Sequence, residues 1–138
     1  MRFIAAGLSA LLVAGCAHVA SADTAADAAP SLADTHWTIA SINGQPATAQ
    51  RKAEMNFTAD RISGNAGCNS FGGGYTIANG TLTATQIIST KMACLGPGMD
   101  QENAVFKILD QPMTITRQHD GSLTLNDAAG TMTLTPAG

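Results

Sequence analysis

The stretch from Arg61 to Cys94, RISGNAGCNSFGGGYTIANGTLTATQIISTKMAC, contains the plainest hairpin signal of the chain and two of its three cysteines. Asn79-Gly80 separates two runs in which apolar residues alternate with polar ones. Both residues tolerate the positive φ of a type I′ turn, so the dipeptide predicts a two-residue hairpin. That turn pairs like with like across the hairpin: Ala78 with Thr81, Ile77 with Leu82, Thr76 with Thr83 and Tyr75 with Ala84.

Two further features of this stretch predict irregular strands. Gly72-Gly73-Gly74 lets the chain turn a barrel corner without a side-chain clash. Gln86 breaks the apolar pattern of the strand that begins at Leu82, and the doublet Ile87-Ile88 predicts a bend or bulge there. If side chains alternate regularly along this strand from Leu82, Ile88 and Cys94 face the interior.

The rest of the domain continues the same alternation. Further strands are predicted at 36–42, 54–58, 61–64, 113–118, 122–126 and 131–135. One helix is predicted near 99–111, because Asp100 and Glu102 suit its amino end and Pro112 stops it. Its apolar stripe, formed by Val105, Phe106, Ile108 and Leu109, predicts burial against a sheet. The fold class is therefore mainly β (α+β), with the helix as a lid or plug on a small barrel.

The alternation of apolar and polar residues predicts the lengths of the loops near the carboxyl terminus. A three-residue loop over 119–121 pairs Ile115 with Leu125 and requires positive φ at Gly121, whereas a two-residue loop would put the apolar residues of the two strands on opposite faces. By the same parity, 127–130 is predicted to be a four-residue loop that pairs Asn126 with Thr131.

The order of these motifs resembles the META domain of HslJ-like bacterial envelope proteins. The resemblance rests on RISGNAGCNSFGGGY at 61–75, ISTKMAC at 88–94 and the segment Glu102-x3-Phe106-x2-Leu109, and it extends from Trp37 to Leu134. It implies a small antiparallel, cracked-barrel-like fold of about eight strands with one helix, in a domain spanning 35–138. It implies no established catalytic activity, and it implies loose links to heat stress, motility and drug tolerance. A similar cracked barrel in a secretin pilotin holds an acyl chain, so an apolar ligand or an envelope protein is the implied partner.

Residues 1–15 are predicted to form a signal peptide of the lipoprotein type. Arg2 supplies the positive charge, and the apolar run after it is too short to span a bilayer. The run ends in VAGC at 13–16, which resembles a bacterial lipobox, so we expect Cys16 to carry lipid. Ala17 follows the cysteine, and in the lipoproteins that this segment resembles such a residue implies the outer membrane, facing the periplasm. The alternative is cleavage after Ala22, which discards Cys16 and gives a soluble periplasmic or secreted protein.

Residues 16–34 are predicted to carry the lipidated cysteine and a tether. They are poor in large apolar side chains and cannot form a core. If flexible, the tether reaches about 20 to 25 Å, which holds a domain just off a membrane surface. The expected contact with the membrane is therefore made through the lipid anchor.

Composition argues against a nucleic-acid partner. The formal net charge is −3, loss of Arg2 with the leader removes one further positive charge, and no basic cluster is denser than Arg51-Lys52. With 138 residues the chain suits one domain, and we expect a monomer.

The sequence offers few sets of residues that could form a catalytic site. A thiol-dependent enzyme would use Cys68 or Cys94 with His36 or His119, and a metal site would draw on the same four residues, but none has the spacing C-x-x-C or H-E-x-x-H. We therefore expect no metal, no other cofactor and a non-enzymatic protein, with the thiol enzyme as the alternative. In an oxidising compartment, Cys68 and Cys94 are expected to form a disulfide, because both fall on inward positions.

Three residues are candidates for binding. Trp37 is the only tryptophan and is either a core plug at the barrel end or a ligand platform. Asn69 and Phe71 follow Cys68 and either shape a turn or contact a ligand. The sequence thus predicts an envelope lipoprotein whose barrel binds or scaffolds another component, linked to tolerance of envelope or heat stress.

Overall fold

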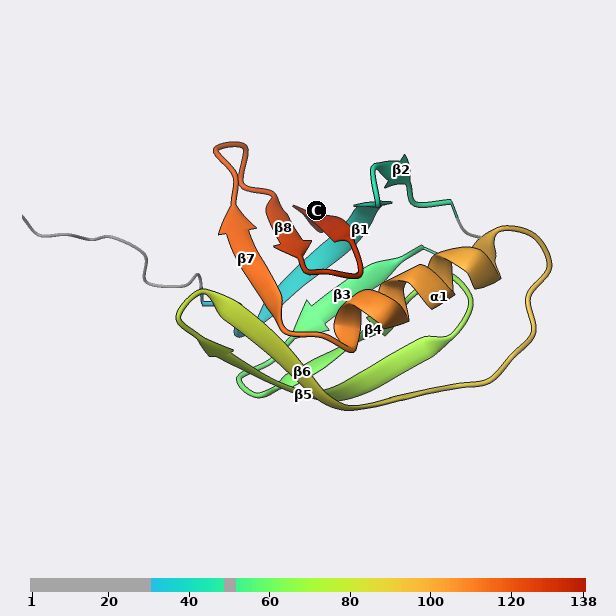
Figure 1. The fold of residues 1–138 in the computed structure, drawn as a ribbon, viewed down its shortest axis with the longest axis horizontal. Coiled ribbons are helices and arrows are strands. Elements are labelled where there is room, and N and C mark those ends of the chain that lie inside the picture. The colour runs from blue at the N-terminus through green and yellow to red at the C-terminus, as the bar shows by residue number, and fades with distance from the viewer. Residues whose placement is uncertain (1–30, 49–51) are drawn as a thin grey trace, which may run out of the picture.

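The computed structural model describes residues 31–48 and 52–138, which form nine strands and one helix. Figure 1 shows the helix lying across the strands. The strands are β1 (Thr35–Ile42), β2 (Gln45–Pro46), β3 (Glu54–Phe57), β4 (Arg61–Asn65), β5 (Ser70–Ala78), β6 (Thr81–Ser89), β7 (Met113–Arg117), β8 (Leu123–Asn126) and β9 (Thr131–Pro136). Helix α1 (Gly98–Leu109) connects β6 to β7.

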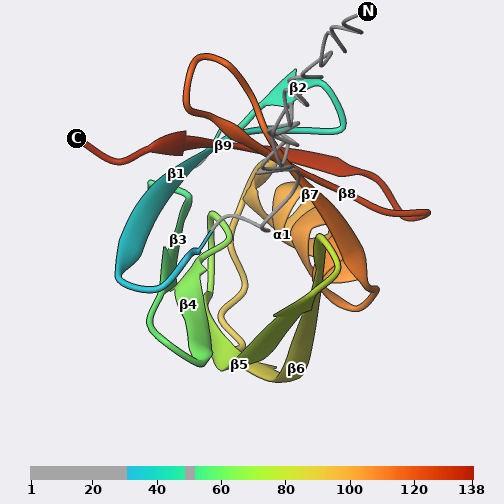
Figure 2. The ribbon, with the colours of Figure 1, turned by 90° about the vertical axis from the view of Figure 1, so that its left-hand side faces the viewer.

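Eight of the strands close into an antiparallel barrel. The order is β1-β3-β4-β5-β6-β7-β8-β9, and β9 pairs back onto β1, while β2 adds only a short hairpin to β1. Viewed from the end, the strands surround α1, which occupies one side of the barrel (Figure 2). The predicted fold class, a mainly β barrel of about eight strands with one helix, is confirmed.

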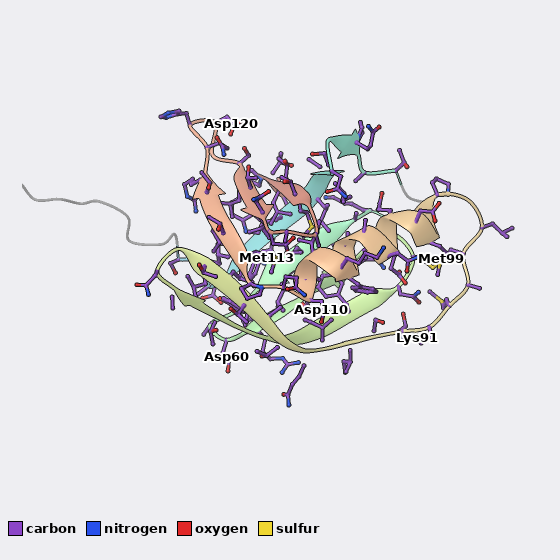
Figure 3. All side chains as sticks on the ribbon, in the orientation of Figure 1. Asp60, Lys91, Met99, Asp110, Met113 and Asp120 are labelled. Carbon is purple, nitrogen blue, oxygen red and sulfur yellow. A yellow bond between two sulfur atoms is a disulfide. The ribbon has the colours of Figure 1, made fainter. Side chains whose placement is uncertain are left out.

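Alternate residues of each strand fill the interior of the barrel. Among the strand side chains with no exposed surface are Met55, Ile62, Leu82, Met113, Leu125 and Met132. On α1, Val105, Ile108 and Leu109 complete this core, which confirms the helix as a plug. Figure 3 shows side chains filling the space between the strands, with Met113 at the centre of the view.

The predicted hairpin registers are confirmed. Across Asn79-Gly80, Ile77 pairs with Leu82, and both turn residues have positive φ. At the second hairpin Ile115 pairs with Leu125, and Gly121 has φ 85°, as a three-residue loop requires. At the third, Asn126 pairs with Thr131 and the amide of Asp127 donates to the Gly130 carbonyl at 3.0 Å. The positions of these turns follow from keeping apolar residues on one face.

The seam between β6 and β7 is the shortest pairing of the barrel wall. It consists of two residue pairs, Thr81 with Thr114 and Leu82 with Met113. Beyond Leu82 the two strands diverge, and α1 lies in the opening (Figure 2). In the described part of the chain, residues 83–89 of β6 therefore have a strand neighbour only on the β5 side.

A bulge in β6 changes which side chains face the interior. Gly72 pairs with Ile88 and Gly74 with Thr85, so Gly73 stands opposite both Gln86 and Ile87. Gln86 takes a left-handed conformation, with φ 51°. Ile87 packs against the core as a result, and Ile88 is 74% exposed. The predicted bulge is confirmed, but the prediction that Ile88 faces inward is wrong, because the extra residue reverses the alternation.

Gly73→Ala is expected to destabilise the protein by about 2 kcal/mol. A Cβ at this position would lie 2.6 Å from the Thr85 carbonyl oxygen and 2.7 Å from the Ile87 Cδ1 atom, so backbone and core would have to move. The matched control is Gly72→Ala, whose Cβ would meet only ordinary contacts at 3.7 Å and beyond. Thermal or urea unfolding of both variants checks this; equal stabilities would mean that the bulge adapts without cost.

Candidate functional site

The turn between β4 and β5 is bonded to the loop that precedes α1. β4 ends at Asn65, and the side-chain oxygen of Asn65 accepts from the Gly67 amide at 2.8 Å. Cys68, 1% exposed, forms a disulfide with Cys94, and the two Cα atoms are 6.0 Å apart. The predicted disulfide is therefore present. In the chain-entropy picture, closing a loop of about 27 residues contributes roughly 3.5 kcal/mol to the free energy of unfolding.

Asn69 bonds the same turn to the segment that leaves β6 and to α1. Its Oδ1 accepts from Thr90 Oγ1 at 2.8 Å and from the Met92 amide at 2.7 Å. Its Nδ2 donates to the Met92 carbonyl at 3.1 Å and to Glu102 Oε1 at 2.8 Å, and its backbone amide donates to Glu102 Oε2 at 2.6 Å. The side chain is 1% exposed, so these bonds are made away from water.

Glu102 is a buried acidic residue on the apolar face of α1. Its side chain is 5% exposed and receives both donors of Asn69, one on each carboxylate oxygen. The sequence places Glu102 three residues before Val105 and seven before Leu109, positions that share one face of a helix. The presence of an acidic residue on that apolar stripe could have indicated a buried interaction. In the sequence analysis, Glu102 was interpreted only as a residue that suits the amino end of the helix.

All three candidate binding residues take part in internal packing. Trp37 is 3% exposed, its indole N–H donates to Thr35 Oγ1 at 2.8 Å, and the Arg117 guanidinium lies 5.7 Å from the ring centroid. Phe71, 5% exposed, packs edge to face on Phe106 with 5.9 Å between ring centroids. Together with the bonds of Asn69, these contacts show that the three side chains contribute to the internal packing and bonding of the domain. A direct contact between any of them and a ligand stays a prediction.

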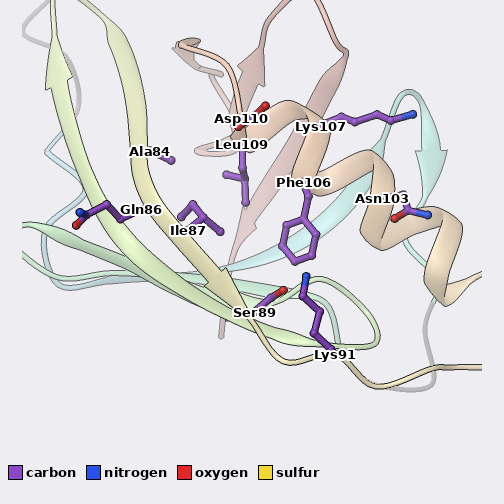
Figure 4. A pocket seen from close by; sticks show the side chains of 10 residues that line it. All are labelled: Ala84, Gln86, Ile87, Ser89, Lys91, Asn103, Phe106, Lys107, Leu109 and Asp110. Atoms are coloured by element: carbon purple, nitrogen blue, oxygen red, sulfur yellow. The ribbon is translucent and has the colours of Figure 1, made fainter.

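An open groove of about 760 Å³ lies between β6 and α1. Figure 4 shows its floor, where Ile87, Phe106 and Leu109 point toward one another from the strand and the helix. Ala84 adds to this apolar floor. The rim is polar and is formed by Gln86, Ser89, Lys91, Asn103, Lys107 and Asp110.

The groove exists because of the short seam and the bulge. Since β7 leaves β6 after Leu82, the opening is bridged by α1 rather than by another strand. The bulge then turns Ile87 toward the floor and places Gln86 at the rim. Two lysines and one aspartate give the rim a surplus of one positive charge. The lining includes neither histidine nor cysteine.

Comparison with known proteins places the fold in a family. The META domain family matches residues 30–137. The chain belongs to the META domain family. Heat shock protein HslJ of Escherichia coli (strain K12) is 29% identical over 136 residues, which cover 96% of this chain and 94% of HslJ.

Two structures solved by NMR share the architecture of this META domain. The first is 30% identical with a TM-score of 0.67, and the match covers 76% of this chain and 91% of the other. The second, from Burkholderia xenovorans, is 23% identical with a TM-score of 0.61, covering 77% and 83% of the two chains. The second likeness concerns the fold alone.

The other chemical groups of the META domain lie apart from each other. Within 31–48 and 52–138, no three histidine, cysteine, aspartate or glutamate side chains are close enough to hold a metal ion. His36 Nδ1 lies 2.8 Å from Asn56 Oδ1, and His119 is exposed next to Asp120 in a hairpin loop. The same described residues include no helix long and apolar enough to cross a membrane.

Two pKa shifts occur away from the groove. Hydrogen bonds from the Ser122 hydroxyl and amide hold the pKa of the Asp120 carboxyl below its usual value. Burial raises the pKa of the Tyr75 hydroxyl, with a smaller contribution from Asp34 and Asp60, and that hydroxyl donates to the Thr58 carbonyl at 2.6 Å. Both groups stabilise turns at the barrel ends.

Asn69→Ala is expected to lower the free energy of unfolding by about 3 kcal/mol. The change removes the side-chain amide that donates to the buried Glu102 carboxylate and accepts from Thr90 and Met92, while the backbone amide of residue 69 remains, and hydrogen bonds to charged groups are the costly ones to lose. The matched control is Asn103→Ala, an exposed position one residue after Glu102 on the same helix. Chemical denaturation of both variants measures the difference. A loss below about 1 kcal/mol at Asn69 would show that this interaction is dispensable.

Proposed function

We propose that this META domain protein is a non-enzymatic, lipid-anchored binding module of the bacterial cell envelope, and that it binds in the groove between β6 and α1. The observation that carries the proposal is the lining of the groove. Ile87 and Phe106 remain only partly buried there, beside a polar rim. Binding sites commonly combine an apolar floor with a few placed polar groups in a cleft of roughly 300 to 1,000 Å³.

The interior of the barrel supports a surface site rather than an internal one. The core side chains of β3, β4 and β6, Met55, Ile62 and Leu82, have no exposed surface. An acyl chain could enter this space only by displacing them. The groove offers apolar contacts without such rearrangement, so it is the better place for a ligand of the folded domain.

A non-enzymatic role is supported by the state of the thiols. Cys68 and Cys94, the candidate nucleophiles, are joined in a disulfide. A nucleophilic cysteine must be a thiolate, which neither residue can become while the bond is intact. The polar residues of the groove rim do not include a histidine that could serve as a base for Ser89.

The proposed location is the outer membrane, on its periplasmic side. The lipobox-like VAGC at 13–16 supports lipidation of Cys16, which lies outside the described residues. A lipid on Cys16 would hold the domain near that membrane. The relative named heat shock protein HslJ supports a role of the same kind for this chain under heat or envelope stress.

Replacing Cys16 with serine is expected to release the protein from the membrane fraction, because serine cannot accept the lipid. Fractionation of cells and intact-mass measurement of the mature protein check this. If cleavage follows Ala22 instead, the mature protein begins at Asp23 and the substitution has no effect on its distribution.

Filling the groove is expected to abolish the protective function while leaving the fold intact. Asn103→Trp places an indole at the groove rim from an exposed helix position, and Thr116→Trp, exposed on β7, is the matched control outside it. In cells lacking the gene, survival of a heat challenge should be restored by the wild type and by Thr116→Trp, and at least tenfold less by Asn103→Trp. Equal restoration by both variants at equal protein levels would remove the groove from the proposed function.

A further inference from the structure

The groove has an unusual wall, because one side of it is a strand edge. Residues 83–89 of β6 pair with β5 on one side only. Along an antiparallel strand, the backbone N–H and C=O groups of alternate residues point to each edge. On the α1 side these groups meet no neighbouring strand within the described chain. Such an edge is a template for another extended segment.

The side chains around this edge suit an added strand. Ile87 and Ala84 lie on the groove side of β6, while Ile88 on the outer side is 74% exposed. A neighbouring strand would cover part of Ile88 and direct its own inward side chains onto the floor formed by Phe106 and Leu109. Strand addition thus explains an exposed isoleucine that the core of the isolated domain does not.

Charge on the rim indicates what kind of segment fits. Lys91 follows the end of β6, and its side chain points into the gap toward Phe106 (Figure 4). Lys107 lies on the helix side of the rim with its side chain directed away from β6, and Asp110 lies at the end of the groove opposite Lys91 (Figure 4). A carboxylate on the incoming segment would meet Lys91, and the net positive charge of the rim favours acidic over basic sequences.

The conformation of Gln86 is a second sign that the edge is specialised. Its φ of 51° is unfavourable for a residue with a side chain, and Gln86 itself lines the groove. Left-handed residues other than glycine are strained, and such residues concentrate at binding sites. Here the conformation sets the direction of Ile87 and of the edge that a partner would meet.

We propose that the groove binds an extended, acidic segment of a partner protein, which adds to the free edge of β6 as an antiparallel or parallel strand. The proposal rests on the groove being the binding site. Backbone hydrogen bonds to residues 83–89 supply affinity, and alternate apolar side chains on the floor supply specificity. At about 3.3 Å per residue, the edge accommodates a segment of roughly seven residues.

The test uses the full lipidated protein in lipid nanodiscs and a phage library of randomised heptapeptides. Wild type should enrich sequences with apolar residues at alternate positions and at least one Asp or Glu, whereas Asn103→Trp should not. The selected peptide is then synthesised in four forms: unmodified, with Asp and Glu replaced by Lys, N-methylated at the odd residues, and N-methylated at the even residues. N-methylation removes backbone donors along one edge while keeping every side chain.

The expected result is that the lysine form and one of the two N-methylated registers bind at least tenfold more weakly. The exposed double variant Lys91→Glu with Lys107→Glu should lose at least tenfold for the unmodified peptide and reverse the preference between acidic and lysine forms. Amide chemical shifts should change along 83–89 when the unmodified peptide binds. Thr116→Trp should bind like the wild type.

Three results would overturn the inference. The first is that the wild type enriches no peptide over Asn103→Trp, and the second is that N-methylation is harmless in both registers. The third is self-association through β6, seen as concentration-dependent shifts at 83–89 without peptide, which would assign the edge to a second copy.

Dodecyl phosphate, added as an amphiphile probe, separates the two proposals. If it binds in the groove while peptides do not, strand addition fails and the proposed binding site stands; if neither binds and Asn103→Trp restores heat survival, the proposed function fails as well.

Discussion

The buried carboxylate of Glu102 is the constraint on which the rest of this structure depends. A helix that packs a glutamate against a barrel must supply partners for both carboxylate oxygens, since an unpaired buried charge is costly. Asn69 supplies both from one residue, with its backbone amide and its side-chain amide. To do so, the chain must turn between β4 and β5 at that point, so the conformation of the turn and the depth of the helix are set together.

The remaining groups of Asn69 extend this constraint to the loop before α1. They bind Met92 on both its amide and its carbonyl, so the chain leaving β6 is held against the turn. The disulfide between Cys68 and Cys94 adds a covalent connection between the same two segments. The amino-terminal half of α1 is thus held in place, through the loop before it, by hydrogen bonds and by the disulfide. Its carboxyl-terminal half is held by apolar packing through Ile108 and Leu109.

The sequence predicts regular pairing well and local irregularity only in part. Asn79-Gly80 and the apolar parity around Gly121 determine their hairpins through local geometry, and both registers were correct. The bulge at Gln86 was also predictable from a broken pattern. The side chains that the bulge turned inward were not predictable. Their direction depends on the close approach of Gly73 to β6, which is a contact between two strands. The pairing of Asn69 with Glu102 was missed for a similar reason. It joins residues 33 positions apart, and only the buried position of Glu102 on its helix hinted at it.

These constraints together leave one wall of the barrel incomplete. The anchoring of α1 to the β4–β5 turn places the helix where β7 would otherwise continue along β6, so the pairing between β6 and β7 ends after two residues. The helix covers the core but cannot satisfy a strand edge, because its own backbone groups are bonded within the helix. Within the described chain, a strand edge without a paired neighbour therefore remains beside a partly covered apolar floor. Because the disulfide and Asn69 fix the helix wall, the width of this opening is set before any partner arrives, and a partner loses less entropy on binding to a preorganised groove than to one that must first form.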